Sequence, residues 1–275
     1  MAQRRVKLLQ GSFPGRPAFD TAFSRALLHR AAAGDGPETF RLYRPDEVVA
    51  FSVLDRTRPG FRRAVAAAAE RGCASVLRLA GGRAALFHAE TLAFSWTVPD
   101  ARARDRIHAR FDAVAGLVAA ALGRLGVDAR IGEVPGEYCP GAHSVNAGGR
   151  VKLMGVGQRV VRGAAHVGGV IVVGRSRRVR EILSPVYRAL ELEWDPATAG
   201  SVEDEVGPIP CREVADALLA ELRRDHELEA ADPEPDALAL AADLESEHRA
   251  TAPPPGAARR PGPGKTQQGD AGLEG

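Results

Sequence analysis

Apolar residues recur at the spacing of an α-helix in six stretches of the chain. In the first of them, Phe19, Phe23 and Leu27 would share one face of the helix. Two others stop at Gly72 and Gly126, where a C-terminal cap is expected. The predicted helices cover residues 19–33, 61–71, 103–125, 179–190, 211–228 and 237–248.

Short apolar runs between these helices are typical of β-strands, and two of them are separated by the turn Arg44-Pro45-Asp46. The predicted strands cover residues 39–43, 48–51, 75–78, 84–87, 92–98, 150–154, 157–161 and 165–173. Hairpins are mixed with helices in this order. It therefore predicts an α/β (α+β) domain with a mixed, mostly antiparallel sheet flanked by helices, and not a doubly wound sheet.

The composition changes towards the C-terminal end of the chain. Residues 251–275 are rich in Pro and Gly and have almost nothing to bury, so we expect a disordered tail. Residues 1–198 are predicted to form the α/β domain. Residues 199–250 are predicted to add satellite helices, interrupted by a Pro-rich break at 232–235.

The balance of charge and the cysteine count exclude several classes of protein. The chain has 37 basic and 35 acidic side chains, so neither nucleic acid nor an anionic membrane is expected as its main partner. No apolar run approaches the ~20 residues of a membrane span, and no signal-peptide core follows the N-terminus. Three cysteines do not suggest a disulfide framework. We expect a soluble, cytoplasmic protein.

A first candidate binding segment lies between two predicted strands. There, Gly81 and Gly82 would let a ligand approach the backbone closely. Arg78 and Arg83 flank them and could grip a carboxylate or phosphate, and His88 follows. Gly-Gly between strands is also a common turn, and His88 could be a hydrogen-bonded structural histidine.

A second candidate segment contains Cys139 in a loop braced by Pro and Gly. Thirteen residues later, Lys152 stands in an apolar strand pattern, followed by Gly155. The lysine could face a pocket or snorkel to the surface, and the cysteine could be an inert, half-buried one. No set of four ligands at zinc spacing is visible, so no metal site is expected.

The two segments together resemble the lipoate–protein ligase and octanoyltransferase family. The resemblance rests on Arg-x-x-Gly-Gly-Arg-Ala-x-x-x-His from Arg78, a long helix, and Gly-Arg-x-Lys-x-x-Gly-x-x-Gln-Arg around Lys152. It covers residues 16–190, about two-thirds of the chain. It implies a mixed sheet flanked by helices, shared with biotin–protein ligases. It also implies that Gly81 and Gly82 line the acyl pocket and that Lys152 is the invariant active-site lysine.

The sequence departs from the pattern of the ATP-dependent ligases in this family. Their first motif normally reads Arg-Arg-x-Ser/Thr-Gly-Gly-Gly, whereas this chain has Leu79, Ala80 and Arg83 at three of those positions. Residues 137–141 read Glu-Tyr-Cys-Pro-Gly where the ligases carry Gly-Asn-Asp. By resemblance, the chain is closest to the branch that places a nucleophilic cysteine in this loop.

The leading hypothesis is transfer of a lipoyl or octanoyl group through a thioester on Cys139. Lys152 would lower the thiol pKa or hold the oxyanion. A thiolate that takes over a preformed acyl group needs no ATP and no other cofactor. The residues expected to bind substrate are Arg78, Gly81, Gly82, Arg83, His88 and Gly155.

Two alternatives remain beside this hypothesis. An ATP-dependent lipoate ligase would use ATP and Mg, with Lys152 on the acyl-adenylate and Cys139 incidental. A non-catalytic carrier-binding protein would have lost the chemistry. The resemblance implies lipoyl-carrier domains as partners, namely the acyltransferase subunits of 2-oxoacid dehydrogenases and the glycine-cleavage H protein. Acyl carrier protein is a further expected partner.

Overall fold

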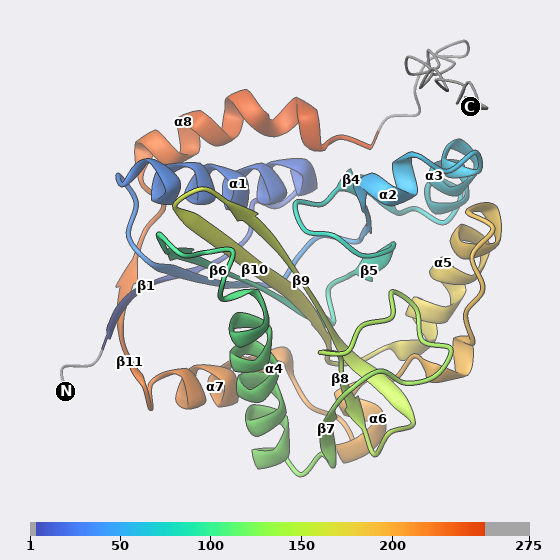
Figure 1. Cartoon of the computed structure of the whole chain (residues 1–275). Coiled ribbons are helices and arrows are strands. Elements are labelled where there is room, and N and C mark those ends of the chain that lie inside the picture. Colours follow the sequence, from blue (N-terminus) through green and yellow to red (C-terminus); the bar gives the residue numbers. More distant parts are fainter. Residues whose placement is uncertain (1–3, 251–275) are drawn as a thin grey trace, which may run out of the picture.

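The computed structural model describes residues 4–250, and the tail predicted to be disordered lies outside the described residues. An eight-stranded sheet crosses the molecule (Figure 1). In spatial order its strands are β11 (His226–Ala231), β1 (Arg4–Gln10), β2 (Thr39–Tyr43), β6 (Thr91–Pro99), β10 (Ala164–Val172), β9 (Val151–Val161), β8 (Val145–Ala147) and β7 (Ala129–Ile131). Strand β1 runs parallel to both of its neighbours, and all other pairs in this sheet are antiparallel.

A smaller sheet stands beside the main one and is built from β4 (Ala74–Leu77), β3 (Val48–Phe51) and β5 (Ala85–Phe87). Strand β3 is parallel to β4 and antiparallel to β5. The architecture confirms the predicted α/β class with a mixed, mostly antiparallel sheet flanked by helices.

Helices cover both faces of the main sheet (Figure 1). One face carries α1 (Pro17–Ala33) with α8 (Pro235–Leu244) stacked on it, and the other carries α4 (Ile107–Arg124) and α7 (Cys211–Leu222). Helices α3 (Phe61–Ala69) and α5 (Ser176–Ala189) pack on each other beside the small sheet. The short helices are α2 (Val53–Arg56), α6 (Val202–Val206), η1 (Pro196–Thr198) and η2 (Glu245–His248).

The main core lies between the sheet and the α4–α7 pair. It contains Phe40, Trp96, Val118 and Leu218, all at least nine-tenths buried. Burial of such apolar side chains is the dominant stabilising contribution to a fold. A separate cluster joins α1 to α8. The face of the sheet under α1 is therefore packed independently of the face under α4.

Periodicity did not predict the two outermost strands on either side of the main sheet, β11 and β1 on one side and β8 and β7 on the other. The helix predicted over residues 211–228 ends at Leu222 in the structure, and β11 begins at His226. Its sequence, His-Glu-Leu-Glu-Ala-Ala, has low β-propensity. Its charges nevertheless pair with β1, as Arg5 Nε lies 3.1 Å from Glu227 and Lys7 Nζ lies 2.7 Å from Glu229. Tertiary contacts therefore override local preference here.

Other boundaries also differ from the prediction. The strands expected at 150–154 and 157–161 are one continuous strand, β9, and the helix expected from residue 103 begins at Ile107. Gly157 lets the backbone of β9 approach the segment at Ala80 and Gly81 closely, since a Cβ on Gly157 would lie 3.0 Å from the Cβ of Ala80.

Candidate active site

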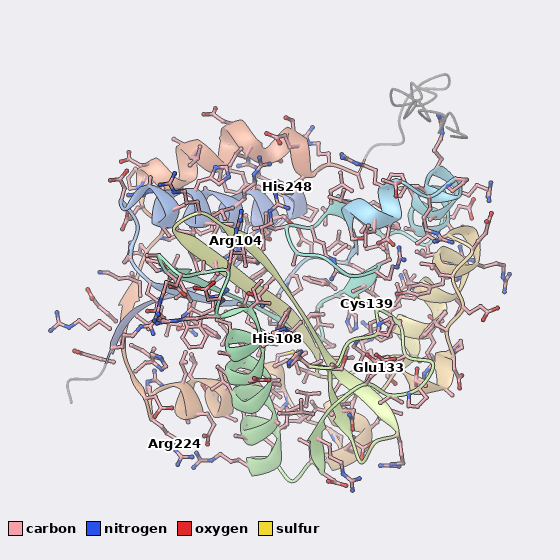
Figure 2. All side chains as sticks on the ribbon, viewed as in Figure 1. Arg104, His108, Glu133, Cys139, Arg224 and His248 are labelled. Carbon is pink, nitrogen blue, oxygen red and sulfur yellow. The ribbon has the colours of Figure 1, made fainter. Side chains whose placement is uncertain are left out.

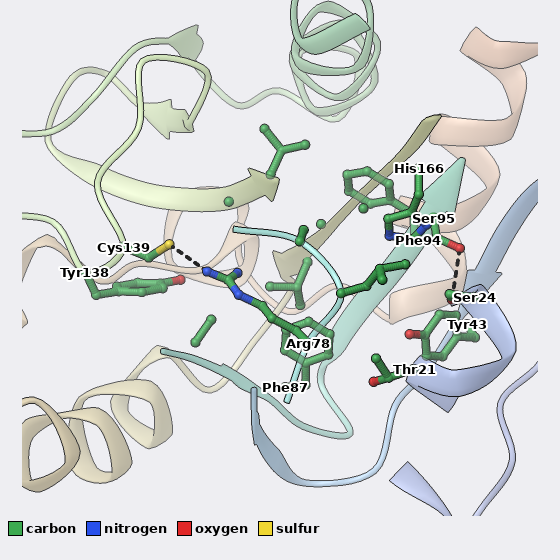
Figure 3. A pocket seen from close by; sticks show the side chains of 18 of the residues that line it. Thr21, Ser24, Tyr43, Arg78, Phe87, Phe94, Ser95, Tyr138, Cys139 and His166 are labelled. Atoms are coloured by element: carbon green, nitrogen blue, oxygen red, sulfur yellow. Dashed lines mark hydrogen bonds between the residues drawn. The ribbon is translucent and has the colours of Figure 1, made fainter. Parts of the chain in front are cut away.

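A narrow cavity runs between α1 and the strands β6, β9 and β10; we call it the inner cavity (Figure 3). Arg78 and Cys139 lie at one end of it, and Ser24, Ser95 and His166 lie at the other. Apolar side chains and glycine backbone form the wall between them. The inner cavity can therefore take an extended, mainly apolar group whose reactive end stands at Cys139.

The nucleophilic candidate Cys139 has an unusual backbone conformation, with φ of 45°. Its N–H donates a hydrogen bond of 2.8 Å to the hydroxyl of Tyr187, which in turn donates to the carbonyl of Ala84 at 2.9 Å. A non-glycine residue at positive φ costs free energy and persists where its surroundings hold it. Tyr187 on α5 therefore ties the cysteine loop to β5.

The sulfur of Cys139 is surrounded by donors. The backbone N–H of Arg83 lies 3.1 Å from Sγ, and Nη2 of Arg78 lies 3.4 Å from it. A Cβ on Gly82 would stand 2.8 Å from Sγ and would overlap Nη2 of Arg78, and Gly82 has φ of +104°. Position 82 must therefore be glycine for this arrangement to form.

These contacts alter the acidity of the thiol. Burial by itself raises the pKa of Cys139, but the charges of Arg78 and Lys152 and the Arg83 N–H outweigh it and lower the pKa below its ordinary value. Burial and neighbouring carboxylates instead raise the pKa of Cys73 to about 12 and that of Cys211 to about 11. Among the three cysteines, Cys139 is the one whose thiolate is favoured.

Lys152 does not snorkel, because its side chain is 1% exposed. Its Nζ donates hydrogen bonds to Oε1 of Glu137 at 2.9 Å and to the carbonyls of Tyr138 and Cys139 at 3.0 and 2.7 Å. The ammonium is thus fully bonded to the loop that carries the cysteine. Lys152 fixes the loop and places a positive charge beside the thiol.

Glu137, the partner of Lys152, was not among the residues predicted from the sequence. Its Oε1 also accepts from the hydroxyl of Ser144 at 2.6 Å and the N–H of Gly141 at 3.2 Å, and its Oε2 accepts from the N–H of Val134 at 3.0 Å. A buried carboxylate with this many donors organises the whole loop. A lone acidic residue two positions before Cys139 was the signal that could have indicated it.

Of the remaining predicted site residues, some contact the inner cavity or the Cys139 sulfur and one does not. Arg78 and Gly155 line the inner cavity with Cys139 and Lys152. Arg83 reaches the sulfur with its backbone, while its guanidinium lies 3.7 Å from Asp55. His88 lines neither this cavity nor the wider groove that opens outside it.

His88 is 1% exposed, and its Nδ1 accepts a hydrogen bond from the N–H of Glu90. Burial lowers the pKa of His88 to about 4. The histidine is therefore neutral near neutral pH and supports the turn that precedes β6.

A wider groove, which we call the outer groove, opens outside the inner cavity and shares Cys139 and Lys152 with it. Gly81 and Gly82 form part of its floor. Its rims are formed by the short helix α2, the beginning of α4 and the loop after Cys139. Cys139 thus stands where a buried cavity meets an open surface.

Two kinds of site have no candidate in the part of the chain that the structure describes. Within residues 4–250, no group of three or more His, Cys, Asp or Glu side chains is placed to hold a metal ion. Over the same residues, no helix is long and apolar enough to cross a membrane.

The chain is similar to known proteins in sequence and in fold. The curated relatives include an octanoyl-[GcvH]:protein N-octanoyltransferase of Geobacillus kaustophilus, 28% identical over 213 residues, which cover 76% of this chain and 74% of the relative. The enzyme of the same name from Anoxybacillus flavithermus is 30% identical over 164 residues, which cover 58% of this chain and 58% of the relative.

Solved structures show the same fold. Lipoate-protein ligase A bound with ATP superposes with a TM-score of 0.69 at 21% identity, covering 91% of this chain and 97% of its own. A bi-partite lipoate protein ligase of Thermoplasma acidophilum gives 0.68 at 20% identity, covering 91% and 95%. The family model of the lipoyl protein ligase A/B catalytic domain matches residues 16–223. The chain therefore belongs to the lipoyl protein ligase A/B catalytic-domain family, as its two motifs predicted.

Proposed function

We propose that this chain transfers an octanoyl or lipoyl group to the acceptor lysine of a lipoyl-carrier domain, through an acyl-thioester on Cys139. One observation carries the proposal: at the reactive end of the inner cavity, the Cys139 sulfur accepts from Arg78 and from the Arg83 N–H, and its pKa is lowered. A thiolate is the nucleophile that such a transfer needs.

The reaction then has two balanced halves. The Cys139 thiolate attacks the carbonyl carbon of the donor thioester or amide, the bond from that carbon to the donor sulfur or nitrogen breaks, and the leaving group takes up a proton. The neutral amine of the acceptor lysine next attacks the Cys139 thioester. Its C–S bond breaks, the new amide loses a proton, and the thiolate is restored. Lys152 contributes positive charge beside both tetrahedral states.

Two observations support transfer over ATP-dependent ligation. In a ligase, Lys152 would bind the acyl-adenylate, whereas here its three donors bond to Glu137, Tyr138 and Cys139. The Gly-Asn-Asp motif of the ligases is also replaced by the loop that holds Cys139. The proposed reaction uses neither ATP nor Mg. The lowered pKa of the thiol likewise favours catalysis over carrier binding alone.

The names of the relatives guide the choice of donor and acceptor. The octanoyltransferases of Geobacillus and Anoxybacillus are named for octanoyl-GcvH, and the Thermoplasma ligase is described with its E2 lipoyl domain. These names support the glycine-cleavage H protein as donor and the lipoyl domains of 2-oxoacid dehydrogenases as acceptors. Acyl carrier protein as a donor stays a prediction.

The decisive experiment is a single-turnover reaction with octanoyl-H protein and no ATP, followed by intact-protein mass spectrometry. We expect the mass to increase by one octanoyl group that hydroxylamine removes. Cys139→Ala should abolish both the adduct and the transfer to an apo lipoyl domain. Cys73→Ala is the matched control and should keep both. Undiminished transfer by Cys139→Ala, or a strict need for ATP, would contradict the proposal and favour a ligase.

A further inference from the structure

The rim of the outer groove exposes large apolar side chains. Within residues 4–250, three large apolar residues are largely exposed: Val53 at 54%, Leu54 at 56% and Ile131 at 48%. Val53 and Leu54 are adjacent on α2 and line the groove that contains Cys139, whereas Ile131 lies on β7 and does not. Adjacent exposed apolar residues beside a reactive centre are typical of an interaction surface.

Helix α2 is held rigidly, so this exposure is built into the fold. Ser52 and Asp55 form a capping box, in which the N–H of Asp55 donates to Ser52 Oγ at 3.1 Å and the N–H of Ser52 donates to Asp55 Oδ2 at 2.9 Å. Asp55 is fully buried, and the guanidinium of Arg83 lies 3.7 Å from it. Because the N–H of Arg83 contacts the Cys139 sulfur, one residue links α2 to the nucleophile.

The lining of the outer groove also includes an exposed cation, Arg159. Arg159 lies on β9, and the exposed His108 in the first turn of α4 lines the groove as well (His108 is labelled in Figure 2). Of residues 4–250, no Asp or Glu lines this groove. The carboxylate of Asp112 does not line the groove and is within hydrogen-bond distance, 3.1 Å, of Nε2 of the lining residue His143. A groove that is lined by an exposed arginine and by no carboxylate favours a partner that presents carboxylates.

We infer that the outer groove is the docking surface for the lipoyl-carrier domain, an inference that rests on the proposed function. The carrier that fits presents its lysine between an apolar side chain, which covers Val53 and Leu54, and a carboxylate, which faces Arg159. Docked in this way, its lysine stands over Cys139. The apolar contact supplies affinity, and the charges guide and orient the carrier.

The test separates carrier binding from chemistry on Cys139. Binding of apo-H protein is measured directly by calorimetry, and acylation of Cys139 is measured with octanoyl-N-acetylcysteamine, a small thioester donor. Leu54→Asp should weaken binding about 10-fold or more, because it places a charge where the carrier's apolar side chain packs. Arg159→Glu should also weaken it, by a factor that shrinks as salt rises. Both variants should acylate Cys139 at the wild-type rate.

Ile131→Asp is the matched control, because it places the same charge on an equally exposed apolar position outside the groove. It should bind apo-H protein like wild type. Wild-type affinity in both Leu54→Asp and Arg159→Glu would overturn the docking surface, and Arg159→Glu alone decides if Leu54→Asp misfolds. Failure of the wild-type protein to acylate Cys139, with carrier binding still lost in the groove variants, would overturn the proposed function and support the docking surface.

Discussion

The inner cavity and the outer groove meet at Cys139, but they differ in burial. The charged groups at the inner end are buried and hydrogen-bonded, whereas the outer groove exposes both charged and apolar side chains. At the inner end, the side chains of Lys152 and Glu137 are at most 1% exposed, and Nζ and both carboxylate oxygens have partners within 3.2 Å. In the outer groove, Arg159 is exposed and more than half of the surface of Val53 and Leu54 is open.

This difference predicts how each region responds to change. Removing one partner of a buried ion pair leaves an uncompensated charge and costs about 3–5 kcal/mol. Substitutions on an exposed surface usually change stability by about 0.5 kcal/mol or less. Inner substitutions should therefore damage both fold and chemistry, whereas outer ones should damage only the transfer to a folded carrier.

The largest effect is expected for Lys152→Met. The sequence context alone suggests that methionine would preserve the fold, but the structure shows that Glu137 would be left buried without its cation. We expect a loss of about 3–5 kcal/mol of unfolding free energy, measured by urea denaturation. Single-turnover acylation of Cys139 should fall about 10²–10³-fold.

The double variant Lys152→Met with Glu137→Gln separates the two roles of the lysine. Glutamine removes the unpaired charge but places an NH₂ group in the same loop, so stability should recover in part. Acylation should stay low, because the cation beside the thiol is still missing. Recovery of the acylation rate together with stability would show that Lys152 acts only through the fold.

A second effect concerns the acidity of Cys139 and requires Arg78. Arg78→Met removes a positive charge that lowers the pKa of the thiol, so that pKa should rise. A higher thiol pKa moves the pH–rate profile to higher pH. The rate of Cys139 acylation should therefore fall several-fold at neutral pH and recover as the pH rises. Arg78→Lys keeps the charge and should restore much of the wild-type profile. A profile that does not move in Arg78→Met would contradict this assignment.

The sequence predicted the parts of the site that depend on local chemistry. Glycine-rich loops and a charge in an apolar strand are local signals, and the structure brings Arg78, Cys139, Lys152 and Gly155 to one cavity end. Tyr187 gives no such signal, because it lies 48 residues after Cys139 on an amphipathic helix. Its role comes from the tertiary contact alone.

The fold shows the same division between local and tertiary signals. Long periodic helices such as α1 and α4 were predicted to within a few residues. The first half of the edge strand β11 was wrongly predicted as helix, and its second half was not predicted, because its Glu residues favour neither strand nor burial and are compensated by cations on β1. Charges that pair across strands are invisible to a pattern of hydrophobicity.

A third, intermediate effect is expected for Tyr187→Phe. The change removes the acceptor of the Cys139 N–H and leaves that buried donor without a partner, which costs about 1–3 kcal/mol. The loop should lose its positive-φ conformation part of the time. The rate of Cys139 acylation should therefore fall, whereas the affinity for the carrier should change little. Thermal unfolding and acylation from octanoyl-N-acetylcysteamine measure the two effects. Wild-type acylation in Tyr187→Phe would show that other contacts set the loop.

The smallest effect is expected for Ser52→Ala, which breaks the capping box of α2 while leaving Val53 and Leu54 in place. Loss of a helix N-cap typically costs about 1 kcal/mol. Because α2 presents the apolar rim, transfer to an apo lipoyl domain should fall several-fold, while acylation of Cys139 by the small thioester stays near wild type. Ser201→Ala is a matched control, since Ser201 forms the same capping box with Asp204 on α6, and neither residue lines the groove. It should lose similar stability and keep full transfer to the carrier. Equal transfer by the two variants would show that the capping box of α2 does not matter for docking of the carrier.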